Sequence, residues 1–318
     1  MKFNNKRKCS IAIVCIFIAL LYLSSKICNF PRTLVCNVTN ISEAHFGTTR
    51  KDDAPLVTLF TSWRTFPKRY EVYNNTLRNW LTLQPHVKLL LFTNDKVSEK
   101  YKQLGWTVLP IKHQIKNFTV LKSMFLEAME LIPKSKLYGF SNGDLLFTGS
   151  FVDSLLAITK SPLLSNKTYM VVGRRLSTPK VTREEASSWE NIQKASKRGK
   201  LMPDTYGIDY FITTPKYNWK NVPDLQIGRA FYDNWVVYDA RRKGYSVIDA
   251  TGSLLAVHQD SPFFPGSLSG RKNNFGYINN TRAKLSKGVI RCCDHHTIYT
   301  NQTTRVEPSK KIPRYCRL

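Results

Sequence analysis

Two short polar segments contain residue types suited to binding a phosphorylated ligand. Thr61-Ser62-Trp63-Arg64 follows an apolar run at 56–61, and Ser141-Asn142-Gly143-Asp144 follows another at 137–140. Both would lie beyond the carboxyl ends of strands, where ligands bind in parallel α/β sheets. A diphosphate needs a divalent cation or basic groups to neutralise it, and hard cations take oxygen ligands such as Asp144.

Asn142-Gly143 also has a purely structural interpretation. Asn-Gly is a strong hairpin-turn signal, and here it would join residues 138–140 directly to residues 145–147. Local sequence leaves both interpretations open.

Alternating strands and helices are expected around these segments. Short β-rich apolar runs indicate strands, and apolar residues at helical spacing indicate amphipathic helices. Strands are expected at 56–61, 87–92, 106–111 and 137–140, and helices at 66–80, 97–104 and 121–131. This order predicts an α/β fold with a mostly parallel sheet flanked by helices.

The chain is less regular after Ser161. Strands are expected at 169–173, 210–213 and 245–250, with a helix capped by Asp233 that runs to about Lys243, while the charged stretch 177–204 is expected to be mobile. No linker divides the chain. Residues 54–290 are therefore predicted to form one domain, followed by a basic, Cys-containing C-terminal tail at 291–318.

The N-terminal region has the layout of a signal anchor. Lys6-Arg7-Lys8 precedes 17 uncharged residues at 9–25, a length at the short end of what spans a bilayer. The positive charges predict a cytoplasmic tail at 1–8, a transmembrane helix at 9–25 and a luminal stem at 26–53. The alternative is a cleaved signal peptide, but no clear cleavage site follows, and we favour the anchor. A short span suits the Golgi or endoplasmic reticulum membrane.

Glycosylation sequons and cysteines agree with a luminal chain. Seven asparagines head N-x-S/T triplets without proline, and they are spread from end to end: Asn37, Asn40, Asn74, Asn117, Asn166, Asn279 and Asn301. Cys292-Cys293-Asp294-His295-His296 lacks the C-x2-C spacing of zinc sites, so a structural disulfide is favoured over zinc there.

The formal net charge of +26 predicts attraction to anions. A luminal chain without DNA-binding motifs does not meet nucleic acid. Nucleotide diphosphates, acidic glycans and anionic surfaces remain as partners.

Several pieces of sequence, in order from about Pro55 to Asp260, resemble the superfamily of nucleotide-diphospho-sugar transferases with the GT-A fold. They are Thr61-Ser62-Trp63, residues 137–146, residues 172–175, Asp209-Tyr210-Phe211, Ile227-Gly228-Arg229 with Asp233-Asn234-Trp235, Asp249-Ala250-Thr251 and Val257-His258-Gln259. They cover roughly two-thirds of the chain. A single-pass anchor, a stem and a luminal transferase domain are also the usual plan of Golgi enzymes in that superfamily.

The resemblance implies roles for individual residues. Asp144 looks like the last aspartate of the D-x-D element, and His258 like the late histidine of the cation site, so both are expected to bind a divalent cation such as Mn²⁺. Asn142 stands at the first D-x-D position, which puts metal dependence in doubt. Thr61, Ser62, Arg64, Asn142, Arg174 and Arg175 join Asp144 as expected donor-binding residues. Structural alternatives are a buried core histidine for His258 and surface cations for the arginine pair.

Asp233 is the expected catalytic residue. Its carboxylate would bind an acceptor hydroxyl or act as general base, with Asn234 and Trp235 beside the acceptor. The alternatives are a plain N-cap for Asp233 and a core position for Trp235. The expected activity is a nucleotide-sugar-dependent glycosyltransferase acting on a glycan or glycoprotein. The second hypothesis is an inactive GT-A-like domain that binds glycans or anionic polysaccharide. A glycoside hydrolase fits poorly, because nothing brings two carboxylates together.

Overall fold

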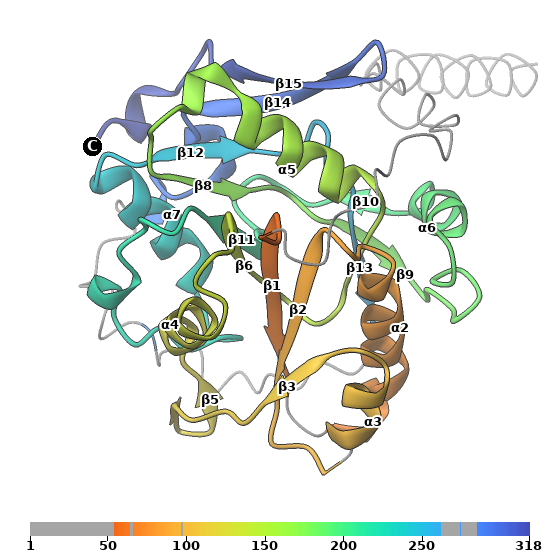
Figure 1. Cartoon of the computed structure of the whole chain (residues 1–318). Helices are drawn as coiled ribbons and strands as arrows, with labels where there is room; N and C mark the ends of the chain where they lie inside the picture. The colour runs from red at the N-terminus through yellow and green to blue at the C-terminus, as the bar shows by residue number, and fades with distance from the viewer. Residues whose placement is uncertain (1–53, 64–65, 97, 262–273, 275–284) are drawn as a thin grey trace, which may run out of the picture. The chain divides into compact units, whose positions relative to one another are not determined.

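A nine-stranded sheet, in the order β15-β14-β12-β8-β11-β6-β1-β2-β3, runs through the described part of the chain (Figure 1). The computed structural model describes residues 54–63, 66–96, 98–261, 274 and 285–318. Five of the eight neighbouring pairs are parallel, which confirms the predicted mostly parallel sheet. The strands are β1 (Val57–Ser62), β2 (Val87–Phe92), β3 (Thr107–Leu109), β6 (Leu137–Ser141), β8 (Tyr169–Val172), β11 (Tyr210–Thr213), β12 (Ser246–Asp249), β14 (His295–Thr300) and β15 (Thr303–Pro308).

Some sequence predictions lie outside these residues. They are the cytoplasmic tail, the anchor and the stem, together with Arg64 and the sequons at Asn37, Asn40 and Asn279. Among the residues that are described, no helix combines the length and apolar character needed to cross a bilayer.

A second sheet of four strands, in the order β10-β9-β13-β7, lies beside the first. Its strands are β7 (Leu145–Phe147), β9 (Leu176–Pro179), β10 (Lys200–Leu201) and β13 (Ala256–Asp260). Since β7 pairs with β13 and not with β6, Asn142-Gly143-Asp144 connects the two sheets. The hairpin interpretation of Asn142-Gly143 is therefore wrong.

Side chains of helix α2 (Tyr70–Leu81) explain why β7 leaves the large sheet. Asn79 Nδ2 donates to Phe147 O at 2.8 Å and Asn79 Oδ1 accepts from Phe147 N at 2.7 Å. Trp80 Nε1 donates to Leu145 O at 2.9 Å. These buried bonds satisfy backbone groups of β7 that a hairpin with β6 would otherwise pair.

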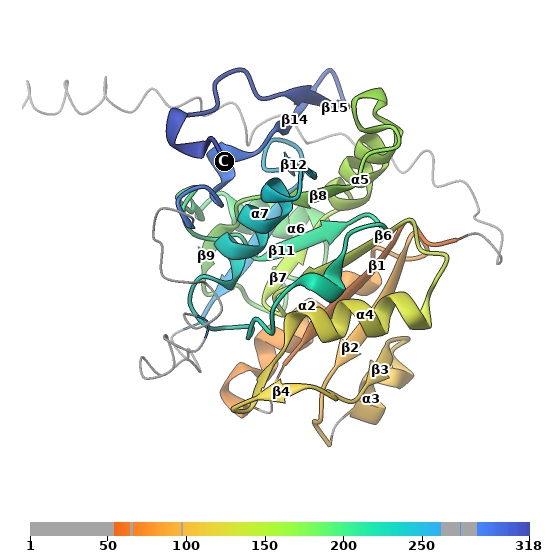
Figure 2. The same cartoon turned by 90° about the vertical axis from the view of Figure 1, so that its left-hand side faces the viewer.

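Helices cover both faces of the large sheet (Figures 1 and 2). Leu59 on one face of β1 belongs to a buried cluster with α2, α3 (Ser98–Gln103) and α5 (Ser150–Lys160). Phe60, on the opposite face, packs with α4 (Leu121–Leu131) and α7 (Tyr232–Arg242), and its ring centroid lies 4.7 Å from that of Phe125. Because both faces of β1 are covered, Val57–Thr61 are all buried, and the two threonines of this stretch, Thr58 and Thr61, are as inaccessible as its apolar residues.

Residues 291–318 extend the large sheet. β14 pairs in parallel with β12 and forms a hairpin with β15, and Cys292 is joined to Cys316 by a disulfide. The predicted preference for a disulfide over zinc at Cys292 is thus confirmed, with Cys293 buried and free.

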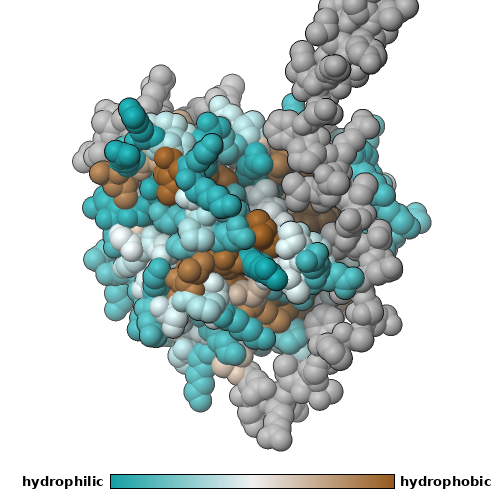
Figure 3. Space-filling view, turned by 90° about the horizontal axis from the view of Figure 1, so that it is seen from above, coloured by the Kyte–Doolittle hydropathy of each residue, from teal (hydrophilic) through white to brown (hydrophobic). Residues whose placement is uncertain are grey.

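Figure 3 looks down on the end of the molecule where β14, β15 and α5 lie, and this surface is largely hydrophilic with smaller hydrophobic spots.

Two predictions about local structure need correction. The stretch 177–204 contains β9, helix α6 (Trp189–Ser196) and β10, because Ile192 of α6 packs in a cluster with Leu146 and Val257. Asp233 is not the N-cap of α7: Phe231 holds that position with a left-handed backbone (φ 70°), and Asp233 lies in the first turn. The remaining described elements are β4 (Gln114–Ile115) and β5 (Phe118–Thr119), with several short 3-10 turns.

Candidate active site

The carboxyl ends of β1 and β6 meet at one edge of the large sheet, because the two strands are parallel neighbours. Asn142-Gly143-Asp144 crosses the end of β1 there, since a Cβ atom at Gly143 would lie 3.2 Å from Thr61 Oγ1. Thr61 is fully buried and Ser62 is half-buried. The structure therefore brings together the two segments that the sequence singled out.

Asp144 is held by two cationic side chains from other elements. Arg69 Nη2 donates to Asp144 Oδ2 at 2.7 Å, and His258 Nε2 lies 3.3 Å from the same oxygen. Arg69 ends the short turn Pro67–Arg69 that leads into α2, and His258 lies on β13. Burial on its own would raise the pKa of Asp144, but the charges of His258 and then Arg69 hold it well below its usual range. Asp144 is therefore an anion at neutral pH.

His258 lies between two carboxylates. Its Nδ1 atom is 2.7 Å from Asp260 Oδ1, opposite the contact with Asp144. Burial opposes the charged imidazolium, yet Asp144 and Asp260 together raise the pKa of His258 to about 9. The side chain is only 14% exposed. His258 is thus an ion-paired imidazolium and not an apolar core histidine.

Asn142 links Asp144 to a second charged pair. Its backbone N–H donates to Asp209 O at 2.9 Å, and its Oδ1 accepts from Tyr232 Oη at 3.1 Å. The Asp209 carboxylate forms an ion pair with Arg175 Nη1. Burial would lower the pKa of Arg175, but Asp209, followed by Asp144 and Asp260, raises it. The side-chain oxygen of Asn142 is therefore engaged within the protein.

Asp233 approaches this pair from the first turn of α7. Burial raises its pKa to about 6; the backbone N–H of Asn234 opposes the rise and the Asp209 carboxylate adds to it. The left-handed Phe231 just before it costs on the order of 1 kcal/mol, strain that is typical of residues that position a functional group. A partly exposed carboxylate with a pKa near neutrality is suited to act as a general base.

Other predicted residues serve the protein's own structure. Asn234 Nδ2 donates to Gly288 O at 3.2 Å, and Trp235 packs in the apolar cluster under α7. Their burial argues against the predicted acceptor contacts of both, and it agrees with the core alternative for Trp235. Arg174 donates from Nη1 to Met202 O at 3.3 Å, whereas Arg175 lies among the charged groups of the site.

Several buried polar atoms at this edge have no partner among the described residues. They are Thr61 Oγ1, Arg69 Nε, Asp144 Oδ1 and Arg175 Nε. Buried polar atoms in folded proteins are nearly always hydrogen-bonded to protein, water or ligand. Unpartnered donors and acceptors at one strand edge therefore indicate a place where a polar ligand or ordered water binds.

The sequence did not single out Arg69, Tyr232 or Asp260 as site residues. Arg69 could have been found, because it follows the carboxyl end of β1 at Ser62 by only seven residues. Asp260 reaches the site through the pairing of β13 with β9, which are distant in sequence, and Tyr232 through the left-handed backbone at the start of α7. Neither feature can be read from local sequence.

The site offers few ligands for a cation. No group of three or more His, Cys, Asp or Glu side chains in the described ranges is arranged to hold a metal ion. The unpartnered Asp144 Oδ1 is one suitable oxygen, and a cation such as Mg²⁺ is commonly held by one or two carboxylates plus substrate phosphates. The residues therefore fit a cation that is shared with a phosphorylated ligand, and not one held by the protein alone.

Four sequon asparagines are described. Asn117, Asn166 and Asn301 are exposed on turns and have positive φ values of 62°, 59° and 49°. Asn74 instead lies within α2, and the hydroxyl of its sequon partner Thr76 is buried and accepts from Gln259 Nε2 at 3.0 Å. Only the first three are placed as freely exposed attachment points.

Neither a protein-family model nor a curated protein matches the sequence. Similar solved structures include the inositol-1-phosphate CTP transferase from T. maritima, with 17% identity, a TM-score of 0.40, and coverage of 66% of this chain and 91% of that one. The mannosyltransferase PcManGT from Pyrobaculum calidifontis, in complex with GDP-Man and Mn²⁺, has 9% identity, a TM-score of 0.41, and coverage of 73% and 66%. The bifunctional IspDF from Campylobacter jejuni has 12% identity, a TM-score of 0.33, and coverage of 62% and 49%. The first two are transferases by name, and likeness at these TM-scores carries no conclusion about this chain.

Proposed function

We propose that this protein is a nucleotide-sugar-dependent glycosyltransferase that moves a hexosyl or related group to an acceptor hydroxyl. The observation that carries the proposal is the charged cluster at the carboxyl ends of β1 and β6. There, buried polar atoms without partners lie among Arg69, Asp144, Arg175 and His258. Such an edge is where α/β sheets bind nucleotides.

Charge balance defines what the donor diphosphate needs. Arg69, Arg175 and His258 carry positive charge, but each faces a carboxylate, from Asp144, Asp209 or Asp260. The cluster is close to neutral in spite of the chain's net charge of +26. A divalent cation such as Mn²⁺, held by Asp144 Oδ1 and the diphosphate, would supply the missing positive charge and stabilise the leaving group. Arg69 and Arg175 would orient the phosphate oxygens through their remaining N–H groups.

Asp233 is the proposed general base. As the acceptor oxygen bonds to the anomeric carbon and the bond to the diphosphate breaks, Asp233 takes the proton of the hydroxyl. A pKa of about 6 leaves the carboxylate mostly deprotonated at pH 7 and still basic enough to accept that proton. Arg175 and Asp209 would set its electrostatic surroundings.

The secretory location is part of the proposal. The N-terminal run at 9–25, the exposed sequons on turns and the Cys292–Cys316 disulfide support a type II membrane protein of the Golgi with a luminal domain. A glycan or glycoprotein in the same compartment would be the acceptor.

A release assay tests the proposal. The full-length protein is incubated with a panel of UDP- and GDP-sugars and Mn²⁺, and free UDP or GDP is measured with and without glycan acceptors. We expect one donor to be consumed, and Asp233→Asn to lose that turnover while still binding the nucleotide. Absence of turnover with every donor, from folded protein, would contradict the proposal.

One observation favours a second candidate, a non-catalytic domain that binds glycans. Asn142 replaces the first D-x-D carboxylate, and its side-chain oxygen is occupied by Tyr232. Such a domain would bind oligosaccharide but neither UDP nor GDP.

A further inference from the structure

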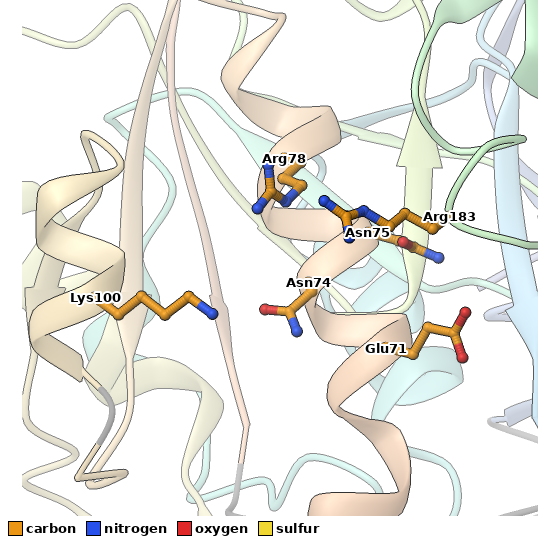
Figure 4. Close-up of a pocket in the computed structure, with 6 residues that line it drawn as sticks. All are labelled: Glu71, Asn74, Asn75, Arg78, Lys100 and Arg183. Carbon is orange, nitrogen blue, oxygen red and sulfur yellow. The ribbon is translucent and has the colours of Figure 1, made fainter.

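A groove over the outer side of α2 has a different chemistry from the strand-edge cluster. It has a volume of about 380 Å³ and is lined by Glu71, Asn74, Asn75 and Arg78 of α2, with Lys100 of α3 and Arg183. Lys100 and Arg183 reach towards α2 from opposite sides (Figure 4). At 1.5 Å per residue, the stretch from Glu71 to Arg78 is about 10 Å long.

The cations of this groove have no carboxylate partners in the described part of the chain. Arg78, Lys100 and Arg183 form no salt bridge there, although each lies near enough to line one cavity with Glu71. Exposed arginines elsewhere do find acidic partners, as Arg198 does with Glu185 and Arg291 with Asp204. Three uncompensated cations around one cavity favour an anionic ligand.

Two further side chains indicate that the ligand also carries hydroxyl groups. The amide of Asn74 makes no hydrogen bond within the described residues, so it is available as both donor and acceptor. The carboxylate of Glu71 would repel a simple anion, but it accepts hydrogen bonds from hydroxyl groups. A fully ionised polyphosphate could accept from the Asn74 amide but has no hydroxyl to donate to Glu71, whereas an acidic sugar would use both side chains.

The groove is rigidly connected to the site at the strand edge. Asn75 Nδ2 donates to Gln259 Oε1 at 3.0 Å, and Gln259 N donates to Asp144 O at 3.0 Å. Arg69, which binds Asp144, directly precedes α2. The wall of the groove is therefore fixed by the residues that also fix Asp144.

We propose that this groove binds an acidic oligosaccharide. Arg78, Lys100 and Arg183 would hold sulfate or carboxylate groups, and Glu71 and Asn74 would hold sugar hydroxyls. Binding here needs neither donor nor turnover, so the proposal stands or falls separately from the transferase activity.

The test is a thermophoresis titration of full-length protein at physiological ionic strength, made in a host that leaves Asn74 without a glycan. The probes are a sulfated heparin hexasaccharide, an unsulfated hyaluronan hexasaccharide and tripolyphosphate. The double variant Arg78→Gln/Arg183→Gln is compared with Lys310→Gln/Lys311→Gln, which removes the same charge from an exposed C-terminal segment.

We expect the groove variant to bind the hexasaccharide at least about tenfold more weakly, because it loses charge-assisted hydrogen bonds. The C-terminal variant should stay within twofold of wild type. Binding of hyaluronan would identify carboxylate as the recognised group, and binding of heparin alone would identify sulfate. Glu71→Ala should weaken hexasaccharide binding but not tripolyphosphate binding, because only the sugar has hydroxyl groups that donate to Glu71. Equal losses in both double variants, or tighter binding of tripolyphosphate than of either sugar, would overturn the proposal.

Discussion

Arg69 and Asp144 are 75 positions apart in sequence, yet Arg69 Nη2 donates to Asp144 Oδ2 at 2.7 Å with both side chains largely buried. The bond ties the start of α2 to the turn between β6 and β7. It also fixes the carboxylate on which the proposed donor site depends.

Removing Arg69 should destabilise the fold. Arg69→Met leaves Asp144 partly buried with only His258 as a cationic partner, so we expect a loss of about 2–3 kcal/mol in the free energy of unfolding. Urea denaturation followed by tryptophan fluorescence measures it.

Arg198→Met is the matched control for this variant. Arg198 pairs with Glu185 at the surface, where the two side chains are 38% and 31% exposed. Such a pair contributes less than about 1 kcal/mol, so the control should stay close to wild type. Equal losses in the free energy of unfolding for the two substitutions would show that the Arg69–Asp144 pair stabilises the fold no more than the surface pair does.

The transferase reaction should depend on the ionisation of Asp233. A general base must be deprotonated, so kcat/KM should fall about tenfold per pH unit below a pKa of about 6 and level off above it. Asp233→Asn should reduce kcat by about 10²- to 10⁴-fold and remove this acidic limb. A wild-type profile that is flat from pH 5 to 8 would exclude Asp233 as the base.

The same substitution should stabilise the protein at neutral pH. Because the folded-state pKa of Asp233 is raised from 3.8 to about 6, the folded protein binds a proton more tightly than the unfolded chain does. Stability is therefore lost as the pH rises through this window. Melting curves should show Asp233→Asn more stable than wild type at pH 8, with the difference disappearing below pH 4. A variant that is less stable at pH 8 would mean that the carboxylate is structurally required.

Glycosylation in secretory cells should follow the exposure of the sequons. We expect one glycan to be lost in each of three variants, Asn117→Gln, Asn166→Gln and Asn301→Gln. Each variant should migrate faster than wild type in gel electrophoresis, and treatment of both proteins with peptide N-glycosidase should abolish the difference. Asn74→Gln should leave the mobility unchanged, because Asn74 lies within α2 and Thr76 is bonded to Gln259. If only Asn74→Gln changed the mobility, the three turn asparagines would not be the glycosylated ones. The groove over α2 would then carry a glycan, which contradicts its proposed role as a binding site.

The strands and helices with strong local patterns could be predicted from sequence. Residues 87–92 and 121–131 were predicted with the bounds that the structure has, because burial of β2 and the apolar stripe of α4 are local properties. The sheet in which β7 pairs could not be predicted, since its backbone is bonded by Asn79 and Trp80, which lie 65 or more positions earlier. The same limit applies to β13, β14 and the stretch 177–204.

The candidate site was predictable in part for a related reason. Asp144 was proposed from its place after the predicted strand at 137–140, and the resemblance to GT-A transferases added Arg175 and His258. Arg69, Asp209 and Asp260 hold these residues in ion pairs that only the folded sheets bring together. The burial of Asn234 likewise follows from how α7 packs and not from the local sequence, whereas a core position for Trp235 was already one of the alternatives drawn from the sequence.

The most direct test of a nucleotide-sugar site is a calorimetric titration of the full-length protein with UDP and GDP, with and without Mn²⁺. Asp144→Asn is compared with Asp153→Asn, which changes an exposed carboxylate on α5. We predict that one nucleotide binds, that Mn²⁺ strengthens binding, and that only Asp144→Asn abolishes the strengthening. If folded wild-type protein binds neither nucleotide with or without Mn²⁺, the strand-edge cluster is not a donor site and the transferase proposal is wrong.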